Sequence, residues 1–387
     1  MRRLTHGGGG LLLPFLLAVL LALTASSCGR GADGAKPFGP ETVDEIDAVV
    51  AGLMERSGAP GALVGIWMED GTVLVKAYGL ADTATEEAMR EDLSFRIGSI
   101  TKTFTGNVVL QLVDEGELSL DDPVSKFVGG IPDGETITVR MLLNHSSGIF
   151  NYGLDTGLNE TIVADPHKVW TPRELVDVGI SSPPYFPPGE GCMYSNTNYI
   201  LLGMIVEEVT GRSFEEELAD RITGPLGLDG TYMAEGPGLG GDHAHGYQVD
   251  VEGGESYDLT DYLDPSISWT AGGMVSTLED LRVWGRALAE GQLLSPGLRE
   301  EMTSGMLEMP GIAEFFGHGM LYGLAVIDFG GWLGHGGMQP GYTSAVYFLP
   351  QKEATVVTMV NISDADEQGT RLFMQVTEVV FPGETPW

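Results

Sequence analysis

The chain has 387 residues, of which 43% are hydrophobic, 20 are basic and 55 are acidic, so its formal net charge is −35. The apolar fraction excludes an intrinsically disordered chain, because such chains lack the apolar residues that offset the entropy lost on ordering. The acidic excess argues against DNA or RNA as a partner, since binding to phosphates needs clustered lysine and arginine. The length fits one large domain or two interleaved lobes.

The N-terminal segment predicts a signal peptide over residues 1–27. Arg2 and Arg3 precede an apolar run from Leu11 to Leu23, which is too short to span a bilayer comfortably. Small residues then stand before Cys28, in a pattern similar to a bacterial lipobox. A twin-arginine signal is an alternative interpretation of the two arginines.

This similarity implies that Cys28 is lipidated and that the glycine-rich residues 28–40 form a flexible tether. We therefore expect an exported protein at the cell envelope, anchored by lipid to the outside of the membrane, or otherwise secreted. Contact with the membrane is expected only through the signal peptide or the lipid.

Hydrophobic periodicity predicts strands near both ends of the remaining chain and helices between them. The helix over residues 43–54 rests on apolar residues at helical spacing, and the first two strands flank an acidic–glycine turn. The expected elements are a helix over residues 43–54, strands over 62–68 and 72–78, a mainly helical stretch over about 98–295, strands over 322–329, 342–349 and 355–360, and a helix over 366–380.

This order predicts the α+β class, with an antiparallel sheet flanked by helices and built from distant segments. The domain is expected over residues 41–387. Its sheet lobe would combine about 41–98 with 296–387, and a mainly helical lobe over about 99–295 would be inserted between them.

The most informative stretch contains Ser99 and Lys102. Their spacing of three places both side chains on one face at the start of a helix. A serine hydroxyl is a poor nucleophile until a neighbour takes its proton, and a desolvated lysine can do so. The start of a helix also offers backbone N–H groups to a developing oxyanion.

Two further motifs follow in chain order. Tyr194 and Asn196 come after a loop rich in proline and glycine. A tyrosine beside an ammonium can have a lowered pKa and relay a proton. An asparagine amide can orient a substrate carbonyl. His335, Gly336 and Gly337 precede the strand from Tyr342, where small residues would let an acyl substrate lie along a strand edge.

Other candidates carry less chemistry. Cys192 is interpreted as a buried small hydrophobe rather than a nucleophile. His243 and His245 have a spacing that can suit a metal, but no third ligand lies nearby in the sequence. We expect no metal and no cofactor.

The motifs S-x-x-K, Y-x-N and H-x-G, in this order, resemble those of the penicillin-recognising serine hydrolases, which include serine D-alanyl-D-alanine carboxypeptidases and class C β-lactamases. The resemblance extends over about residues 40–380. Further matching stretches are 139–148, 194–211, 243–247 and 268–273.

The resemblance implies a β-lactamase/transpeptidase-like fold and a role for each matching residue. Ser99 would be acylated, while Lys102 and Tyr194 share its proton. Asn196 would hold the substrate amide, His335 would assist at the third motif, and Trp269 would form a wall of the pocket. Gly336 and Gly337 would leave room for the substrate along the strand edge. The backbone N–H groups of Ser99 and Met338 would bind the oxyanion.

The third motif departs from the carboxypeptidase pattern. Gly336 and Met338 stand where threonines usually grip a C-terminal carboxylate, and residues 323–328 contain no arginine. These changes remove charge-assisted hydrogen bonds to such a carboxylate. An ester or amide with an uncharged leaving group would suit the site better.

The implied function is an exported D-alanyl-D-alanine carboxypeptidase that works through an acyl-enzyme and binds penicillin. Its partners would be a peptidoglycan peptide or another small molecule, and β-lactams. An esterase or β-lactamase of the same fold is the alternative, and a non-catalytic binder of cell-wall fragments is a third interpretation.

Overall fold

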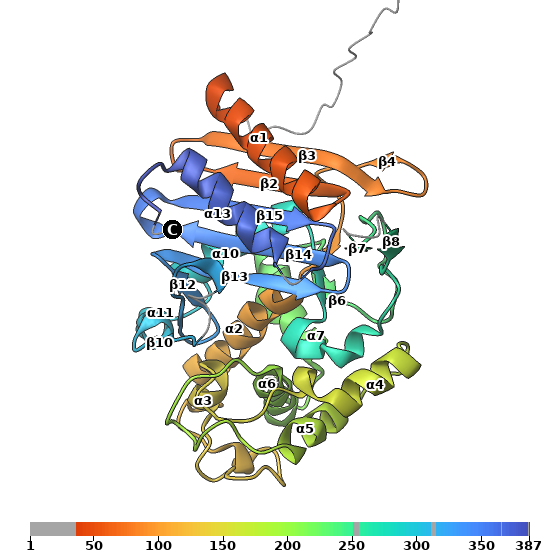
Figure 1. Cartoon of the computed structure of the whole chain (residues 1–387). Coiled ribbons are helices and arrows are strands. Elements are labelled where there is room, and N and C mark those ends of the chain that lie inside the picture. Colours follow the sequence, from red (N-terminus) through yellow and green to blue (C-terminus); the bar gives the residue numbers. More distant parts are fainter. Residues whose placement is uncertain (1–35, 251–254, 311–314, 365, 386) are drawn as a thin grey trace, which may run out of the picture. The chain divides into compact units, whose positions relative to one another are not determined.

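A sheet of ten strands, counted over the described residues, joins the two ends of the chain (Figure 1). The computed structural model describes residues 36–250, 255–310, 315–364, 366–385 and 387. The strands of this sheet are β1 (Lys36–Pro37), β2 (Gly61–Trp67), β3 (Thr72–Asp82), β4 (Glu87–Ala88), β10 (Leu307–Glu308), β11 (Leu321–Tyr322), β12 (Ile327–Phe329), β13 (Trp332–Gln339), β14 (Tyr342–Leu349) and β15 (Ala354–Val360).

The strand order is β1-β3-β2-β15-β14-β13-β12-β11-β10, with β4 beside β3. The β1–β3 pair is parallel, and the other pairs described in this sheet are antiparallel. The register places Ala62 opposite Val360, so the centre of the sheet is made by segments from opposite ends of the chain.

Helices cover both faces of this sheet. All residues of β14 and β15 are buried, as expected for strands packed on two sides. Figure 1 shows α1 and α13 on the near face and α10 behind it. The helices are α1 (Pro40–Ser57), α2 (Thr101–Asp114), α3 (Val139–Leu143), α4 (Thr156–Ala164), α5 (Pro172–Ser181), α6 (Asn196–Thr210), α7 (Phe214–Leu218), α8 (Gly224–Leu226), α9 (Trp269–Gly272), α10 (Leu278–Glu290), α11 (Pro296–Thr303) and α13 (Gln368–Val380).

The region between the two parts of the sheet is mainly helical and packs around α2 and α6. Eleven of the fourteen residues of α2 are buried, including the polar residues of its first two turns, because other elements surround the helix. Two small sheets lie in this region; their strands are β5 (Phe95–Arg96), β9 (Met274–Ser276) and β6 (Tyr232–Met233), and β7 (Tyr247–Asp250) with β8 (Glu255–Asp258).

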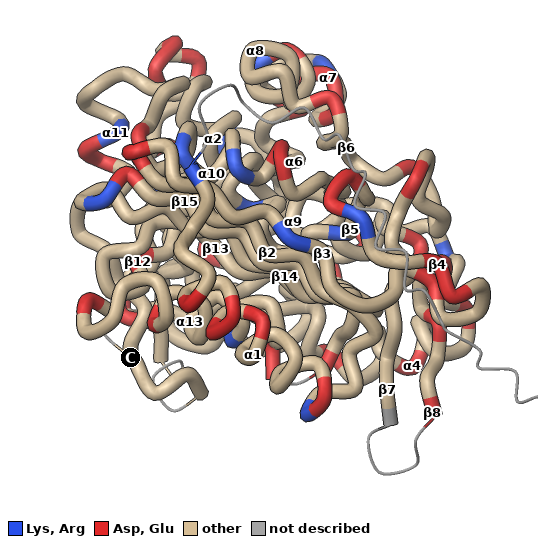
Figure 2. Tube along the Cα trace, turned by 90° about the horizontal axis from the view of Figure 1, so that it is seen from above, with Lys and Arg blue, Asp and Glu red and all other residues tan. Residues whose placement is uncertain are grey.

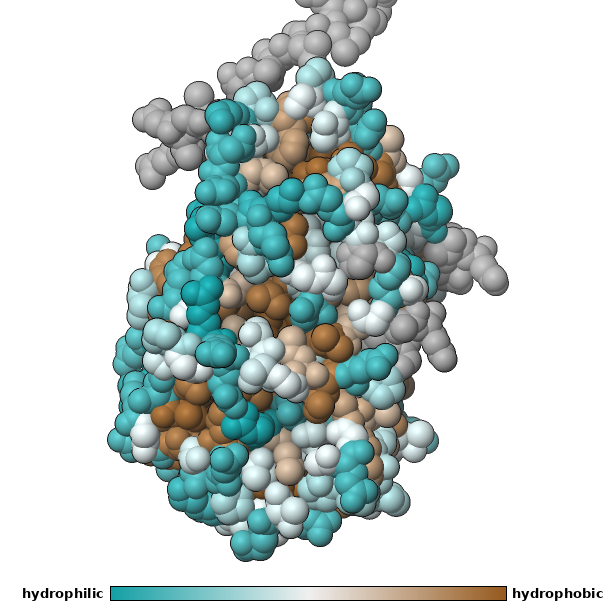
Figure 3. Space-filling model, turned by 90° about the vertical axis from the view of Figure 1, so that its left-hand side faces the viewer, coloured by the Kyte–Doolittle hydropathy of each residue, from teal (hydrophilic) through white to brown (hydrophobic). Residues whose placement is uncertain are grey.

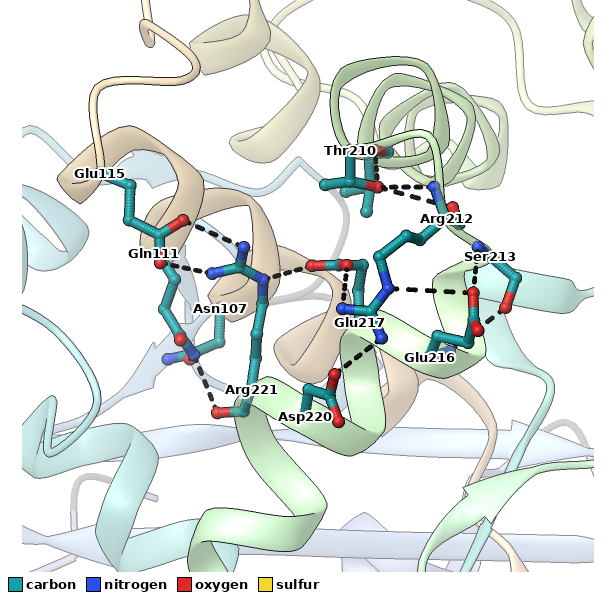
Figure 4. Close-up of polar contacts among 11 residues, drawn as sticks. Asn107, Gln111, Glu115, Thr210, Arg212, Ser213, Glu216, Glu217, Asp220 and Arg221 are labelled. Atoms are coloured by element: carbon teal, nitrogen blue, oxygen red, sulfur yellow. Dashed lines mark hydrogen bonds and ion pairs between the residues drawn. The ribbon is translucent and has the colours of Figure 1, made fainter.

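An ion-pair network ties α7 and the turn after it to the end of α2 (Figure 4). The side chain of Glu217 is only 2% exposed and lies 2.9 Å from an Arg212 nitrogen and 2.5 Å from Arg221 Nε. Arg221 also reaches Glu115 at 2.6 Å. A buried carboxylate is tolerated here because two guanidinium groups compensate its charge.

The surface reflects the acidic composition. Figure 2 shows acidic positions around the periphery of the trace, with fewer basic positions among them. Figure 3 shows a face that is mostly hydrophilic and is interrupted by separate apolar areas. Among the described residues, no helix combines the length and apolarity needed to cross a bilayer.

The predicted fold class is confirmed, and α1, β2, β3, β14, β15 and α13 match the expected elements. One prediction is wrong in detail: the strand expected over 322–329 is broken into β11 and β12, with Ala325 at a φ of 61° between them. The third motif precedes the strand from Tyr342 as expected, and it lies in β13, a strand that the sequence did not predict. The predicted signal peptide, Cys28 and most of the tether lie outside the described residues.

Candidate functional site

Ser99 lies in a 3₁₀ turn, Gly98–Ile100, that leads directly into α2. Strand β13 passes very close to this turn because glycines face each other there. A Cβ on Gly337 would stand 2.0 Å from a backbone oxygen just before the turn, and one on Gly98 would stand 2.5 Å from the Met338 nitrogen. The missing side chains therefore bring Ser99 beside the third motif.

The three groups expected to exchange protons are within hydrogen-bond distance. Lys102 Nζ lies 3.0 Å from Ser99 Oγ, and the Tyr194 hydroxyl donates to the same oxygen at 2.8 Å. Lys102 follows one helical turn after Ser99 on α2, whereas Tyr194 comes from the segment just before α6. The structure thus joins two motifs that are 95 residues apart.

Lys102 is fully buried and its protonation state is set by desolvation. Burial lowers the pKa of its amine well below the usual value, because no carboxylate compensates a positive charge there. One N–H donates to Ala271 O at 2.6 Å. A neutral amine then has its lone pair available to Ser99, which suits it to act as a general base.

The expected lowering of the Tyr194 pKa is wrong. Burial raises the pKa of Tyr194 well above its usual value, the Tyr322 side chain adds to this, and the hydrogen bond to Ser99 only partly opposes it. A neutral amine attracts a phenolate much less than an ammonium would, so the desolvation outweighs the effect of the hydrogen bond to Ser99. Tyr194 therefore keeps its proton and can donate it to a leaving group rather than remove one.

His335 is buried and contacts another part of the site. Its Nδ1 bonds the Gly336 carbonyl, and its Nε2 lies 3.1 Å from the Tyr322 hydroxyl. Burial lowers the pKa of His335 to about 3, so the ring is neutral. No hydrogen bond joins it to Ser99 among the described contacts, which indicates a positioning role for this residue.

His145 supports Tyr194 from behind. Its Nδ1 accepts the Ser195 N–H at 3.2 Å, which confirms the expectation that this histidine bonds backbone. The centre of its ring lies 4.5 Å from that of Tyr194. The phenol is therefore held between packed rings, and its hydroxyl points to Ser99.

Two cavities meet at Ser99, and both also contact Asn196 and Met338. The first, which we call the polar cavity, measures about 440 Å³ and is lined by residues that include Tyr152, Gln248, Tyr262, Gln339 and Asp364. The second, which we call the methionine cavity, measures about 370 Å³ and is lined by residues that include Met309, Phe316, Met320, Ile327, Tyr347 and Glu367. Neither lining contains a lysine or an arginine.

Asn196 and Trp269 differ in how they relate to these cavities. Asn196 Oδ1 is buried and has no hydrogen-bond partner, so it is free to accept an N–H from a bound substrate. The prediction that Trp269 walls the pocket is wrong: its indole donates to Glu215 at 3.2 Å and packs on Phe214. Its neighbours Ser268, Ala271 and Gly272, in and beside the short helix α9, line the polar cavity instead.

The remaining histidines and cysteine carry no catalytic arrangement. His245 Nδ1 lies 2.7 Å from an Asp258 oxygen, and no cluster of metal-ligand side chains occurs in the described part of the chain. Burial raises the pKa of Cys192 to about 11, which makes this thiol a poor nucleophile. Its interpretation as a small buried hydrophobe is confirmed.

Sequence reasoning missed Tyr322, Tyr347 and Glu367. Tyr322 and Tyr347 lie in predicted strands, but strand alternation says only that they share a face with other residues and not that the face borders a cavity. Glu367 stood at the expected start of the last helix, where acidic residues are common for capping reasons alone. Only the folded sheet brings the three residues near Ser99.

A buried lysine beside a serine at the start of a helix, completed by a tyrosine and set against the edge of an antiparallel sheet, defines the class of active-site serine hydrolases. The sequence profile of the β-lactamase family matches residues 46–381. The chain therefore belongs to the β-lactamase family and is a serine hydrolase of that superfamily.

Solved structures and curated relatives agree with this membership. The structure is similar to a D-stereospecific amidohydrolase from Streptomyces sp., with 31% identity, a TM-score of 0.76, and coverage of 89% of this chain and 99% of the other. It is also similar to the D-amino acid amidase of Ochrobactrum anthropi, with 26% identity, a TM-score of 0.77, and 88% and 98% coverage. Penicillin-binding protein 4* of Bacillus subtilis is 27% identical over 340 residues, which are 81% of this chain and 71% of that protein.

Proposed function

We propose that the chain hydrolyses amide or ester bonds through an acyl-enzyme on Ser99. Lys102 takes the hydroxyl proton as Ser99 Oγ attacks the carbonyl carbon, and Tyr194 donates its proton to the leaving group. The leaving group departs as a neutral amine or alcohol. Water then attacks the acyl carbonyl and gives a proton to the Tyr194 phenolate, while the Lys102 ammonium returns a proton to Ser99 Oγ, so the acid is released and all three groups are restored. The observation that carries the proposal is the pair of contacts to Ser99 Oγ, at 3.0 and 2.8 Å, from a buried lysine and a tyrosine.

Binding of the reacting carbonyl would use groups that are already in position. Asn196 Oδ1, buried and unpartnered, accepts an N–H of the substrate. The backbone N–H groups of Ser99 and Met338 hold the oxyanion, since β13 lies against the turn that carries Ser99.

The lining of the two cavities favours substrates without a carboxylate next to the scissile bond. Neither lining contains a lysine or arginine, and each contains one acidic residue, Asp364 or Glu367. A carboxylate there would meet repulsion instead of a charge-assisted hydrogen bond. Amino acid amides, for which the similar D-amino acid amidase is named, and esters with an uncharged leaving group are therefore the proposed substrates.

The second candidate is a D-alanyl-D-alanine carboxypeptidase that binds penicillin. The likeness to penicillin-binding protein 4* favours it, and the same acylation chemistry serves both activities. This activity requires hydrogen-bond donors other than lysine or arginine side chains to bind the C-terminal carboxylate of the peptide.

The test compares three substrates with the wild type and Ser99→Ala. These are D-phenylalanine amide, a diacetylated tripeptide ending in D-Ala-D-Ala, and p-nitrophenyl acetate. We expect turnover of the amide and the ester, which Ser99→Ala reduces by about 10³-fold or more, and mass spectrometry after incubation with a fluorescent penicillin should find the adduct on Ser99. Faster release of D-Ala than of either other product would favour the second candidate, and unchanged turnover by Ser99→Ala would refute both.

Export and lipid anchoring are part of the same proposal and rest on the sequence before residue 29. Expression of the whole chain in a bacterium fed labelled palmitate should label the protein, and Cys28→Ser should abolish the label while leaving the serine chemistry intact. A labelled Cys28→Ser protein would contradict the anchor.

A further inference from the structure

The methionine cavity contains a carboxylate that is not in an ion pair. Glu367 is half-buried, lines this cavity and forms no hydrogen bond or ion pair through its carboxylate in the described structure. A Cβ on Gly336 would stand 4.0 Å from Glu367 Oε2, so the carboxylate faces the strand that carries the third motif. The backbone of Glu367 has a φ of 49°, a conformation that a non-glycine residue adopts only when its surroundings hold it.

The nearest guanidinium group does not neutralise this charge. Arg371 lies one helical turn after Glu367, but its Nε donates to Asp366 O at 2.8 Å and a terminal nitrogen donates to Phe315 O at 3.3 Å. Its ion pair is with the Asp366 side chain, at 3.7 Å. Burial raises the pKa of Glu367; the charge of Arg371 opposes this in part and repulsion from Asp364 adds to it, so the carboxylate loses solvation without a direct hydrogen bond or ion pair in return.

A second polar group in the same cavity also lacks a partner. Tyr347 has no exposed surface, and its hydroxyl oxygen is buried without a hydrogen bond of normal geometry, although the backbone N–H of Gly336 acts on it. Its ring is fixed by packing on Phe373, with ring centres 4.5 Å apart. Buried hydroxyls are usually satisfied, so an unpartnered one that lines a cavity points to a polar group on the ligand.

The end of the cavity away from Ser99 is lined by apolar side chains as well. Met309, Phe316, Met320 and Ile327 line it and are each less than 9% exposed. A ligand that fills the space must therefore combine an apolar part with a group that satisfies the carboxylate and the hydroxyl.

We propose that the methionine cavity binds the free ammonium group and apolar side chain of an aminoacyl amide or ester, with Glu367 as the residue that selects the charged amine and Tyr347 as a second acceptor. This inference rests on the proposed function, because it places the scissile carbonyl at Ser99, where the cavity begins. It assigns the substrate class: primary amines with an apolar skeleton, rather than N-acylated compounds. An acetyl group removes the positive charge and adds bulk at the point where the carboxylate lies.

The test measures binding without turnover, by isothermal titration calorimetry in a Ser99→Ala background. The ligands are D- and L-phenylalanine amide and their N-acetyl derivatives, at about pH 6.5, where an α-amino group is protonated. We expect the amine to bind about tenfold to a hundredfold more tightly than its acetylated form. Adding Glu367→Gln should abolish that preference by weakening only the amine, whereas Glu378→Gln, an exposed position on the same helix α13, should leave it unchanged.

Two further variants keep the test decisive. Glu367→Asp retains the charge with a shorter reach and should give an intermediate preference, and Tyr347→Phe should cost less than Glu367→Gln because only a neutral acceptor is lost. Equal affinities of amine and N-acetyl forms in the Ser99→Ala protein, or no detectable binding of either amide, would overturn the inference. Ester hydrolysis that depends on Ser99 would then still support the proposed function, so the two failures can be told apart.

Discussion

At the scale of single residues, burial sets the protonation states of Lys102 and Tyr194 in opposite directions. The pKa of the amine is lowered and the pKa of the phenol is raised. Burial therefore favours the neutral form of both groups, in which the amine can accept a proton and the phenol can give one. Neither state needs a neighbouring charge, because desolvation alone is sufficient.

The burial of Lys102 predicts a cost in stability. Between its lowered pKa in the folded protein and the usual value of 10.5 in the unfolded chain, the unfolded chain binds a proton that the folded protein does not. Raising the pH toward 10.5 therefore favours folding, and lowering it opposes folding. We expect Lys102→Met to lower kcat by about 10²- to 10⁴-fold and to raise Tm relative to wild type, by more at pH 7 than at pH 10.

Circular dichroism melts at the two pH values check this prediction. The matched control is Lys76→Met, which removes a partly exposed lysine outside the site. A Tm difference for Lys102→Met that grows as the pH rises would contradict a neutral buried amine.

The same pKa directions predict a one-sided pH profile. Activity should fall on the acid side as Lys102 becomes protonated. It should stay level up to about pH 10, because Tyr194 keeps its proton beyond its usual range. Measured kcat for p-nitrophenyl acetate, corrected for spontaneous hydrolysis, tests this; a decline between about pH 8 and 10 without loss of folded protein would argue against it.

At the scale of elements, the close approach of β13 to the turn of Ser99 depends on Gly337. A Cβ there would stand 2.0 Å from a backbone oxygen, whereas a Cβ on Gly336 would meet the Thr370 hydroxyl at 2.6 Å. Backbone cannot move aside as easily as a side-chain end. We expect Gly337→Ala to cost about 1–3 kcal/mol of stability and to lower kcat by moving Met338 away from the oxyanion, and Gly336→Ala to be milder on both counts.

Urea unfolding and steady-state kinetics of the two alanine variants provide the comparison. Equal effects from the two substitutions would mean that the contact with the turn is not what positions the oxyanion donors.

The elements and motifs that were predicted correctly from the sequence are determined by residues that lie close together in the chain. Helix α1 follows from apolar residues at helical spacing, with Pro40 at its start and Gly58 in the left-handed conformation at its end. Ser99 and Lys102 are linked by helix geometry alone. The break at Ala325 and the strand β13 were missed because Gly334, Gly336 and Gly337 have low strand propensity, and only pairing with β14 makes them a strand.

The site residues that escaped prediction depend on long-range contacts. Tyr347 and Glu367 reach the cavity only once β14 and α13 are assembled. The wrong expectation for the Tyr194 pKa has the same origin, since the depth of burial cannot be read from a motif. The Trp269 ring was misplaced because family resemblance fixes the position of the backbone and not the direction of a side chain.

At the scale of the whole molecule, the net charge of −35 predicts a stability that depends on salt. Acidic positions lie around the periphery of the trace (Figure 2), and a charge so far from zero destabilises the compact state through self-repulsion. Exposed ion pairs contribute little in return. We expect Tm to rise from about 0.01 M to about 1 M NaCl, as the Debye length shrinks from about 30 to about 3 Å.

Differential scanning calorimetry over this range measures the effect. A Tm that falls with salt would mean that the ion pairs, including the buried Glu217 network (Figure 4), outweigh the repulsion.

The pairing of β2 with β15 has a consequence for how the protein is made. Strand β2 leaves the ribosome early, yet its partner follows almost 300 residues later, as the register of Ala62 with Val360 requires. During most of synthesis the nascent chain therefore exposes an apolar strand with unpaired backbone groups. The central sheet can close only when translation is nearly complete, so the β2 edge depends on protection from aggregation until β15 has emerged.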